Sequence, residues 1–246
     1  MIYGATFADH RMQMSKELCR KSMLANGVDD VLDIPCKNVS AGRGAGYWQW
    51  MPEIVIKGIL ACRYLGQDFF VYSDAGVEFT SSITHITDRM RSTDHVWLFG
   101  NEHAHEHWCK SDVLRALSWK GTDRDKQVQA SVHVWRTTDE ALTIAKDWDT
   151  ACIPKWMIDD SSSNIPNHPQ FKEHRHPQAV LTCIAHTYGL PLHWWPTQYG
   201  NHIKSMYPKD KYPVLFNHHG KRDPHAKDGR DFWDIKNYKA IMDSYE

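Results

Sequence analysis

An acidic residue ends an apolar strand in the segment Phe69 to Gly76, which reads Phe-Phe-Val-Tyr-Ser-Asp-Ala-Gly. In α/β proteins, ligands bind outside the carboxyl ends of the strands. The small residues after Asp74 leave room there for a bulky polar ligand or a hydrated metal ion. Gly76 allows a backbone or a phosphate group to approach closely. We therefore expect Asp74 to lie in a ligand site.

Aromatic side chains precede this strand in the segment Gly46 to Pro52, which reads Gly-Tyr-Trp-Gln-Trp-Met-Pro. The flat faces of Tyr47 and Trp48 suit stacking on a nucleobase or a sugar. The alternative is a hydrophobic staple that packs against the helix after Pro52. Lys57 lies within that helix, where it faces either a phosphate group or solvent.

A dense group of titratable residues, Glu-His-Arg-His at 173–176, stands before another predicted helix. Arg175 offers a fixed cation for a phosphate group, and Glu173 or His176 offers a general base. We expect Gln178, in the first turn of the helix, to point at the same site. The alternative is a capped helix start on the surface.

Histidines also alternate between Asn101 and Cys109, at His103, His105 and His107. Imidazoles at this spacing share one face of a strand, and the cysteine adds a thiolate, which is typical of a metal site. However, no second ligand group follows at a defined spacing. We therefore expect a solvated histidine-rich loop here rather than a metal centre.

A last group, Phe216 to Arg222, places two histidines and two cations after a strand. His218 or His219 is a candidate to complete a metal site with Asp74. Lys221 is a candidate to bind a pyrophosphate. The alternative is a basic turn at the surface.

The elements that must position these groups follow from the apolar periodicity. Strands are predicted over 2–8, 30–34, 69–73, 96–99 and 128–135, and helices over 14–25, 53–65, 112–119, 138–152 and 177–188. A helix or helical turns are predicted over 80–91. Short strands and turns follow over 191–216, and a last helix over 231–243. The loop 159–170 has little apolar surface to bury, which predicts a mobile flap. The strand–helix–strand order indicates an α/β fold with a mostly parallel sheet flanked by helices.

Composition limits the class of protein. A chain of 246 residues with 41% hydrophobic content suits a single domain over 1–246. The net charge of −1 gives no basic field for nucleic acid, and no 18-residue apolar stretch predicts a membrane span. Six scattered cysteines, with no Cys-x-x-Cys pair and no signal-peptide pattern, favour a cytoplasmic protein. Sixteen histidines and eleven tryptophans suit stacking on sugars or bases.

Taken in this order, four segments resemble a glycosyltransferase family of the GT-A type, which has a nucleotide-diphospho-sugar transferase fold. The family pattern contains Gly-Tyr-Trp-x-Trp-Lys-Pro, Tyr-Ser-Asp-Ala-Gly, Gln-x-x-Ala-Ser and Glu-His-Arg-His-Asp-Gln-Ser. The matching segments of this chain are Gly46 to Pro52, Tyr72 to Gly76, Gln127 to Ser131 and Glu173 to Gln178. The resemblance spans roughly residues 2–220.

The resemblance implies transfer of a sugar from a nucleotide-diphosphate-sugar donor to a glycan or another hydroxyl acceptor. It implies a divalent metal ion, Mn²⁺ or Mg²⁺, held by Asp74 and by His218 or His219. It implies a catalytic group of Glu173, His176 and Gln178, with a base from Glu173 or His176 if the reaction inverts the sugar. The implied donor-binding residues are Thr6, Phe7, Tyr47, Trp48, Lys57, Tyr72, Asp74, Gly76, Arg175 and Lys221.

The chain departs from the family pattern at three points. Met51 replaces a lysine, Pro177 replaces an aspartate, and Asp74 has no second aspartate two residues later, as the Asp-x-Asp signature requires. These departures leave a second interpretation open, a decayed transferase fold that binds sugars or nucleotides. A third interpretation is a histidine-rich metal-binding protein without transferase activity.

Overall fold

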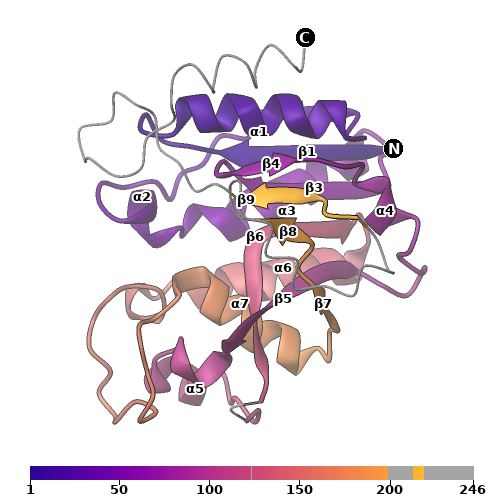
Figure 1. Cartoon of the computed structure of the whole chain (residues 1–246). Helices are drawn as coiled ribbons and strands as arrows, with labels where there is room; N and C mark the ends of the chain where they lie inside the picture. The colour runs from indigo at the N-terminus through magenta and orange to yellow at the C-terminus, as the bar shows by residue number, and fades with distance from the viewer. Residues whose placement is uncertain (123, 199–212, 219–246) are drawn as a thin grey trace.

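A six-stranded sheet forms the centre of the computed structural model, which describes residues 1–122, 124–198 and 213–218 (Figure 1). The strands lie in the order β2-β1-β3-β6-β5-β7. β6 is antiparallel to both of its neighbours and the other pairs are parallel, so the sheet is mostly parallel, as the sequence predicts. The bounds are β1 Ile2–Phe7, β2 Asp30–Leu32, β3 Phe69–Asp74, β5 Val96–Ala104, β6 Lys126–Arg136 and β7 Leu192–Trp194.

Both faces of this sheet are covered (Figure 1). On one face α3, α6 and α7 pack against β3, β6 and one another, and on the other α1 packs against β1 and a three-stranded sheet, β4-β9-β8. The helices are α1 Gln13–Ala25, α2 Gly44–Tyr47, α3 Trp50–Tyr64, α4 Thr84–Thr87, α5 Ser111–Ala116, α6 Asp139–Cys152 and α7 His176–Thr187, with short 3₁₀ turns η1 His105–His107 and η2 Lys155–Met157. The small sheet consists of β4 Val77–Phe79, β8 Thr197–Gln198 and β9 Phe216–His218.

Side chains of β3 alternate between two hydrophobic cores. Phe70 and Tyr72 pack into the core beneath α3, α6 and α7, whereas Val71 packs with Cys19 of α1. Because both faces are covered, the strand reads as a continuous apolar run. Gly58 lets α3 approach the sheet, since a Cβ atom there would lie 2.2 Å from the ring of Phe70.

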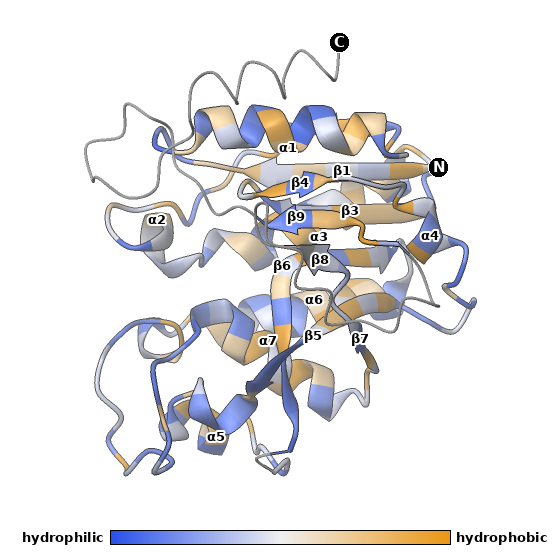
Figure 2. Cartoon of the chain, viewed as in Figure 1, coloured by the Kyte–Doolittle hydropathy of each residue, from blue (hydrophilic) through white to orange (hydrophobic). Residues whose placement is uncertain are grey.

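The ends of β5 and β6 extend beyond the sheet as a polar ribbon (Figure 2). The ribbon begins beyond the pair of Gly100 with Val128 and ends where Ala104 pairs with Lys126. Figure 2 shows the far ends of both strands as hydrophilic, unlike the apolar centre of the sheet. The polar ribbon therefore offers side chains for a ligand rather than for a core.

Several predicted elements differ from the structure. Over 80–91, where a helix or helical turns are predicted, the structure has the short helix α4, and the strand predicted over 96–99 continues into the histidine-rich segment as far as Ala104. The pairing of the small sheet was not predicted, because Val77 and His218 belong to segments far apart in sequence. The helix predicted over 231–243 lies outside the described residues.

The loop 159–170, predicted to be a mobile flap, is hydrogen-bonded to the body of the protein at several points. The buried ammonium of Lys110 donates hydrogen bonds to Asp159 and Ser161, and also to the carbonyl of Trp156. Further along, the backbone of Asn164 donates to Asp112. The composition indicated few apolar contacts, but it did not show that a buried cation would replace them.

In the part of the chain that the structure describes, no helix has the length and apolar composition needed to cross a membrane.

Candidate functional site

Two adjoining pockets form a cleft outside the carboxyl ends of β1 and β3. Their volumes are about 750 Å³ and about 410 Å³. Arg43, Trp48, Asp74 and His218 line both pockets. Ligands bound in the two pockets would therefore lie next to each other, beside these shared residues.

The larger pocket lies where β1 and β3 end. Phe7 and Asp74 are register partners at the ends of these strands, and both line the pocket together with Gly76. After β1, Arg11 makes an ion pair with Asp9, and its guanidinium also donates to the carbonyl of Gly42. This contact ties the end of β1 to the glycine-rich loop 40–46.

Arg43 joins the glycine-rich loop to two segments later in the chain. Its guanidinium lies 3.2 Å from Asp160 and 3.3 Å from Glu173. Gly44 has a φ of +57°, and a Cβ atom there would lie 2.3 Å from the ring of Trp48. A side chain at this position would therefore displace Trp48 from the cleft.

Backbone strain is concentrated beside the cleft. Of the five described non-glycine residues with positive φ, four are cleft neighbours: Ala45, Tyr47, Trp48 and His176. Such conformations cost on the order of 1–3 kcal/mol each and gather at functional sites. They also show that the aromatic segment is not extended: Trp50 packs on Phe7, whereas Trp48 stacks on His176.

The smaller pocket combines the polar ribbon with the start of α7. Asn101 and His103 of β5, Gln129 and Ser131 of β6, and Gln178 of α7 line it. The carboxamide of Gln178 accepts a bond from the backbone of Ala130 and donates to Gln127. These groups are mostly uncharged donors and acceptors, which suit hydroxyl groups.

His176 is held in one tautomer at the edge of the smaller pocket. Its Nδ1 lies 2.7 Å from the carbonyl oxygen of Ile158, which can only accept, so Nδ1 carries the proton. Nε2 therefore bears the lone pair. This atom is buried, makes no hydrogen bond to the described residues and lies 3.8 Å from Oδ1 of Asp160. Burial lowers the pKa of His176, so the ring is neutral at pH 7. A neutral imidazole with a free lone pair is able to accept a proton.

Asp74 is ionised at neutral pH, but only just. Burial raises the pKa of Asp74 to about 6, although hydrogen bonds from Tyr72 and Ser131 act in the opposite direction. The Tyr72 hydroxyl donates to Oδ1 of Asp74 over 2.7 Å. Tyr72 is itself fully buried and stacks on His133 with a centroid distance of 4.7 Å. The carboxylate is therefore held from below by a rigid side chain.

Replacing Tyr72 with Phe is expected to raise the pKa of Asp74 further, because the variant lacks a bond that favours the ionised form. A divalent cation at Asp74 would need the ionised carboxylate, so any Mn²⁺-dependent nucleotide binding should fall away near pH 6 in the wild type. In the variant the same loss should occur about one pH unit higher or more. Titrations of binding against pH would measure this, with Tyr3→Phe on β1 as control. Identical pH profiles for the wild type and Tyr72→Phe would contradict the account.

The donor set of the cleft fits a divalent cation. Asp74 supplies a carboxylate, and His218 of β9 supplies an imidazole to the same two pockets. Burial lowers the pKa of His218 to about 4, so this ring is neutral at pH 7, as a metal ligand must be. A carboxylate and an imidazole suit Mn²⁺, whereas softer metal ions prefer thiolate ligands.

Several predicted site residues lie outside the two pockets. Thr6 lines a separate small pocket beside α1, and Lys57 makes an ion pair with Glu53 within α3. Tyr47 lies behind the cleft with its ring 5.4 Å from His176. Their positions favour structural roles and do not support the donor contacts expected of them.

Of the residues just before α7, one lines the smaller pocket and two lie outside the cleft. Arg175 lines the smaller pocket, with its guanidinium over the ring of Trp108 at 4.4 Å. Glu173 lies outside both pockets, paired with Arg43 and Arg175, so it positions these cations rather than facing the cleft. His174 is buried and donates to the carbonyl of Met157. His219 and Lys221 lie outside the described residues.

Sequence reasoning missed Arg11 and Arg43, the two cations that frame the larger pocket. Arg43 is the single charged residue in Ser-Ala-Gly-Arg-Gly-Ala-Gly at 40–46, and that isolation was the available signal. A loop so rich in glycine approaches ligands closely. Nothing in the pattern around Arg11 distinguishes it from an ordinary surface cation.

Comparisons with known proteins support the fold. No family model and no curated protein matches the chain. Among solved structures, it is similar to the galactosyltransferase LgtC in complex with donor and acceptor sugar analogues, with a TM-score of 0.51, 12% identity, and coverage of 99% of this chain and 96% of that one. It is also similar to a glycosyltransferase involved in the glycosylation of the major capsid of PBCV-1, with a TM-score of 0.50, 15% identity, and coverage of 88% and 92%. The GT-A-like α/β fold expected from the sequence is therefore confirmed.

Proposed function

We propose that the protein is a glycosyltransferase that moves a sugar from a nucleotide-diphosphate-sugar donor to a hydroxyl group of a glycan or another acceptor. The observation that carries this proposal is the pair of adjoining pockets that share Asp74 at the end of β3. A transferase needs two ligand sites that meet at the reacting bond. The structural neighbours, one of them with donor and acceptor sugar analogues, agree with this use of the fold.

We assign the donor to the larger pocket. Phe7, Trp48 and Gly76 offer flat and open surfaces for a base and a sugar, and Arg11 and Arg43 offer positive charge for a diphosphate. Asp74 and His218 are the residues that would hold Mn²⁺ or Mg²⁺. When bound, such an ion neutralises charge on the leaving nucleoside diphosphate.

We assign the acceptor to the smaller pocket. Asn101, Gln129 and Gln178 offer hydrogen bonds to hydroxyl groups, and Trp48 offers an aromatic face. Nε2 of His176 is the candidate to accept the hydroxyl proton if the sugar is inverted, because its lone pair makes no hydrogen bond to the described residues, although the atom is buried and lies 3.8 Å from Asp160. Pro177 replaces the family aspartate without disturbing the backbone at the start of α7. It stands in the first turn, where an N–H group would have no partner within the helix.

A thermal-shift screen of nucleotide sugars, with and without Mn²⁺, tests the proposal. A ligand that binds only the native state raises the melting temperature with the logarithm of its excess over Kd. We expect stabilisation by at least one nucleotide sugar, enhanced by Mn²⁺. The absence of a shift with every common nucleotide sugar would count against a donor site in the cleft.

Replacing Arg43 with Gln is expected to weaken binding of the nucleotide sugar by about 10-fold to 100-fold, because a charge-assisted bond contributes on the order of 1.5–3 kcal/mol. Isothermal titration calorimetry would measure the change. Arg63→Gln is the matched control, since Arg63 pairs with Asp139 away from the cleft. Equal affinities for Arg43→Gln and the wild type would remove Arg43 from the donor site.

The decayed-transferase interpretation remains the second outcome of these experiments. Its motivation is Pro177 in place of the family aspartate. Stable binding of a nucleotide sugar without transfer to any acceptor would favour it. Pro177→Asp would then be the variant in which transfer is sought.

A further inference from the structure

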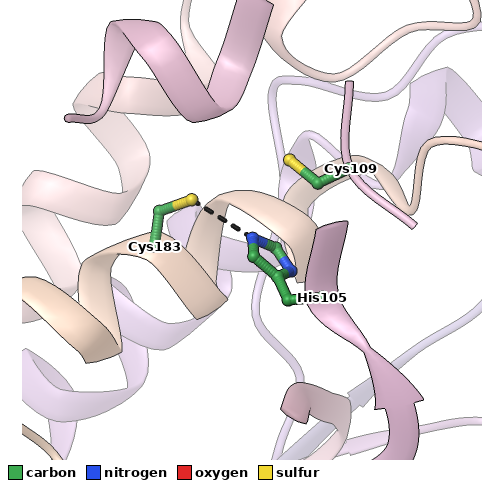
Figure 3. A group of neighbouring side chains, drawn as sticks. All are labelled: His105, Cys109 and Cys183. Carbon is green, nitrogen blue, oxygen red and sulfur yellow. Dashed lines mark hydrogen bonds between the residues drawn. The ribbon is translucent and has the colours of Figure 1, made fainter. Parts of the chain in front are cut away.

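A buried cluster of one imidazole and two thiols lies behind the smaller pocket (Figure 3). His105 comes from η1, Cys109 from the segment just after it, and Cys183 from the middle of α7. Their exposed fractions are 0%, 0% and 1%. One ligand atom from each lies within 4.8 Å of the other two, and Nε2 of His105 lies 3.3 Å from Sγ of Cys183. Figure 3 shows the imidazole directed toward the sulfur of Cys183.

This geometry corrects the expectation of a solvated histidine-rich loop. Helix α7 supplies the second ligand group that the local sequence lacked, 74 residues after Cys109. The neighbouring imidazoles turn elsewhere: His103 packs on Trp108 at 4.6 Å, and His107 on His168 at 4.8 Å. Only one imidazole of the segment therefore enters the cluster.

We propose that His105, Cys109 and Cys183 form a Zn²⁺ site. Zinc binds thiolate sulfur at about 2.3 Å and imidazole nitrogen at about 2.0–2.1 Å, so tetrahedral ligands of these two kinds lie about 3.5 Å apart. The separation of 3.3 Å between Nε2 and Sγ already matches that edge. Little movement of these two side chains would be needed to accept the ion.

Charge balance selects a divalent ion. Two thiolates and one neutral imidazole carry a charge of −2, which Zn²⁺ cancels, whereas Cu⁺ would leave a net negative charge. An uncompensated charge in an interior this dry is costly. Soft sulfur ligands also exclude Mg²⁺ and Mn²⁺, so the site differs in chemistry from the carboxylate and imidazole of the cleft.

The surroundings supply part of a second shell. Nδ1 of His105 lies 3.4 Å from the carboxamide of Gln127, which also contacts the carbonyl of Trp108. When zinc occupies Nε2, the proton moves to Nδ1. The Gln127 amide must then turn its oxygen toward Nδ1 to accept the bond, which gives up the bonds that the amide makes with Trp108 and Gln178. The described residues provide three ligands, so a water molecule would complete the tetrahedron.

The ion would join two segments that carry the smaller pocket. Trp108 and Lys110 flank Cys109, and they support Arg175 and the loop 159–170 respectively. Cys183 lies on the same helix as Gln178. Zinc would thus hold the η1 segment against α7, whether or not the cleft transfers a sugar.

Cobalt substitution tests this site without an activity assay. Chelator-treated, reduced protein is titrated with Co²⁺. We expect one equivalent to bind with thiolate-to-cobalt charge-transfer absorption and the visible bands of tetrahedral cobalt, and Zn²⁺ to abolish both. The cleft has no cysteine among its described lining residues, so cobalt bound there would lack the thiolate absorption.

Cysteine variants assign the ligands. Cys183→Ser and Cys109→Ser should each weaken Co²⁺ binding at least 100-fold, more than loss of a second-shell partner does. Cys152→Ser, a buried cysteine outside the cluster, should bind as the wild type does. Circular dichroism would establish that each variant is folded.

Three results would overturn the proposal. The first is a folded, reduced wild type that shows no thiolate absorption with Co²⁺. The second is full absorption in both cluster variants. The third is a Cys109–Cys183 disulfide in peptide maps of the protein as isolated, which would make the pair a redox couple instead.

Discussion

Replacing Asp74 with Asn is expected to lower kcat/KM for sugar transfer by 100-fold to 1,000-fold, the effect of removing one charge-stabilising group from an active site. The variant retains an oxygen that can accept the Tyr72 bond, so the structure around it is preserved. It lacks the negative charge that a divalent cation needs. Steady-state kinetics with Mn²⁺ would measure the loss.

The same variant is expected to be more stable than the wild type at neutral pH in the absence of metal. The folded protein raises the pKa of Asp74 from 3.8 to about 6, so the native state disfavours the charge. The stability that this group contributes is complete below about pH 4 and is lost as the pH rises through 6. Because Asn cannot ionise, the variant does not lose this stability. The difference in unfolding free energy is about 1–3 kcal/mol at pH 7 for a partly exposed group.

Urea unfolding at pH 7 and at pH 4 would separate these effects. A gain in unfolding free energy at pH 7 that disappears at pH 4, together with lost turnover, is the expected pattern for a carboxylate kept for function. Ser73→Ala is a useful neighbour control, because the buried Ser73 hydroxyl bonds with Cys19 and the Asp74 carbonyl rather than with the Asp74 carboxylate. Loss of stability in Asp74→Asn at pH 7 would show instead that the carboxylate is a structural group.

Replacing Lys110 with Met is expected to lower the unfolding free energy by about 2–4 kcal/mol. Its ammonium is only 4% exposed and makes an ion pair with Asp159. Methionine fills a similar volume but leaves the carbonyls of Trp156 and Ser161 without their donor. Turnover should fall as well, because the same segment carries Ile158, which fixes the tautomer of His176.

Lys126→Met provides the matched control for Lys110→Met. Lys126 is exposed, and its ammonium donates to one carbonyl, that of Glu102. Its replacement should change the unfolding free energy by less than about 0.5 kcal/mol. Equal small effects from both variants would show that the loop 159–170 does not depend on the buried cation.

The sequence predicted the parts of the fold that depend on local pattern. Apolar periodicity located β3 and α3 closely, and Asp74 stands at the end of a central strand as expected. The small sheet could not be predicted in this way, because Val77 and His218 meet only through tertiary pairing. The same reason hid the cluster of His105 and Cys183, whose members lie on separate elements.

Side-chain direction was the second limit. Thr6 and Phe7 are neighbours in sequence, but alternation along β1 sends Thr6 toward α1 and Phe7 into the cleft. The motif predicts that Glu173 lies in the cleft. In the structure its carboxylate is instead bound by Arg43 and Arg175. A motif identifies residue types at a site, but the backbone decides which of them face it.

The most direct test of the central claim is the release of nucleoside diphosphate from nucleotide sugars in the presence of Mn²⁺ and a panel of sugar acceptors. We expect release by the wild type with at least one donor, stimulated by an acceptor and lost in Asp74→Asn. No release from any donor by folded wild type, or equal release by Asp74→Asn, would contradict the assignment of this cleft to glycosyl transfer.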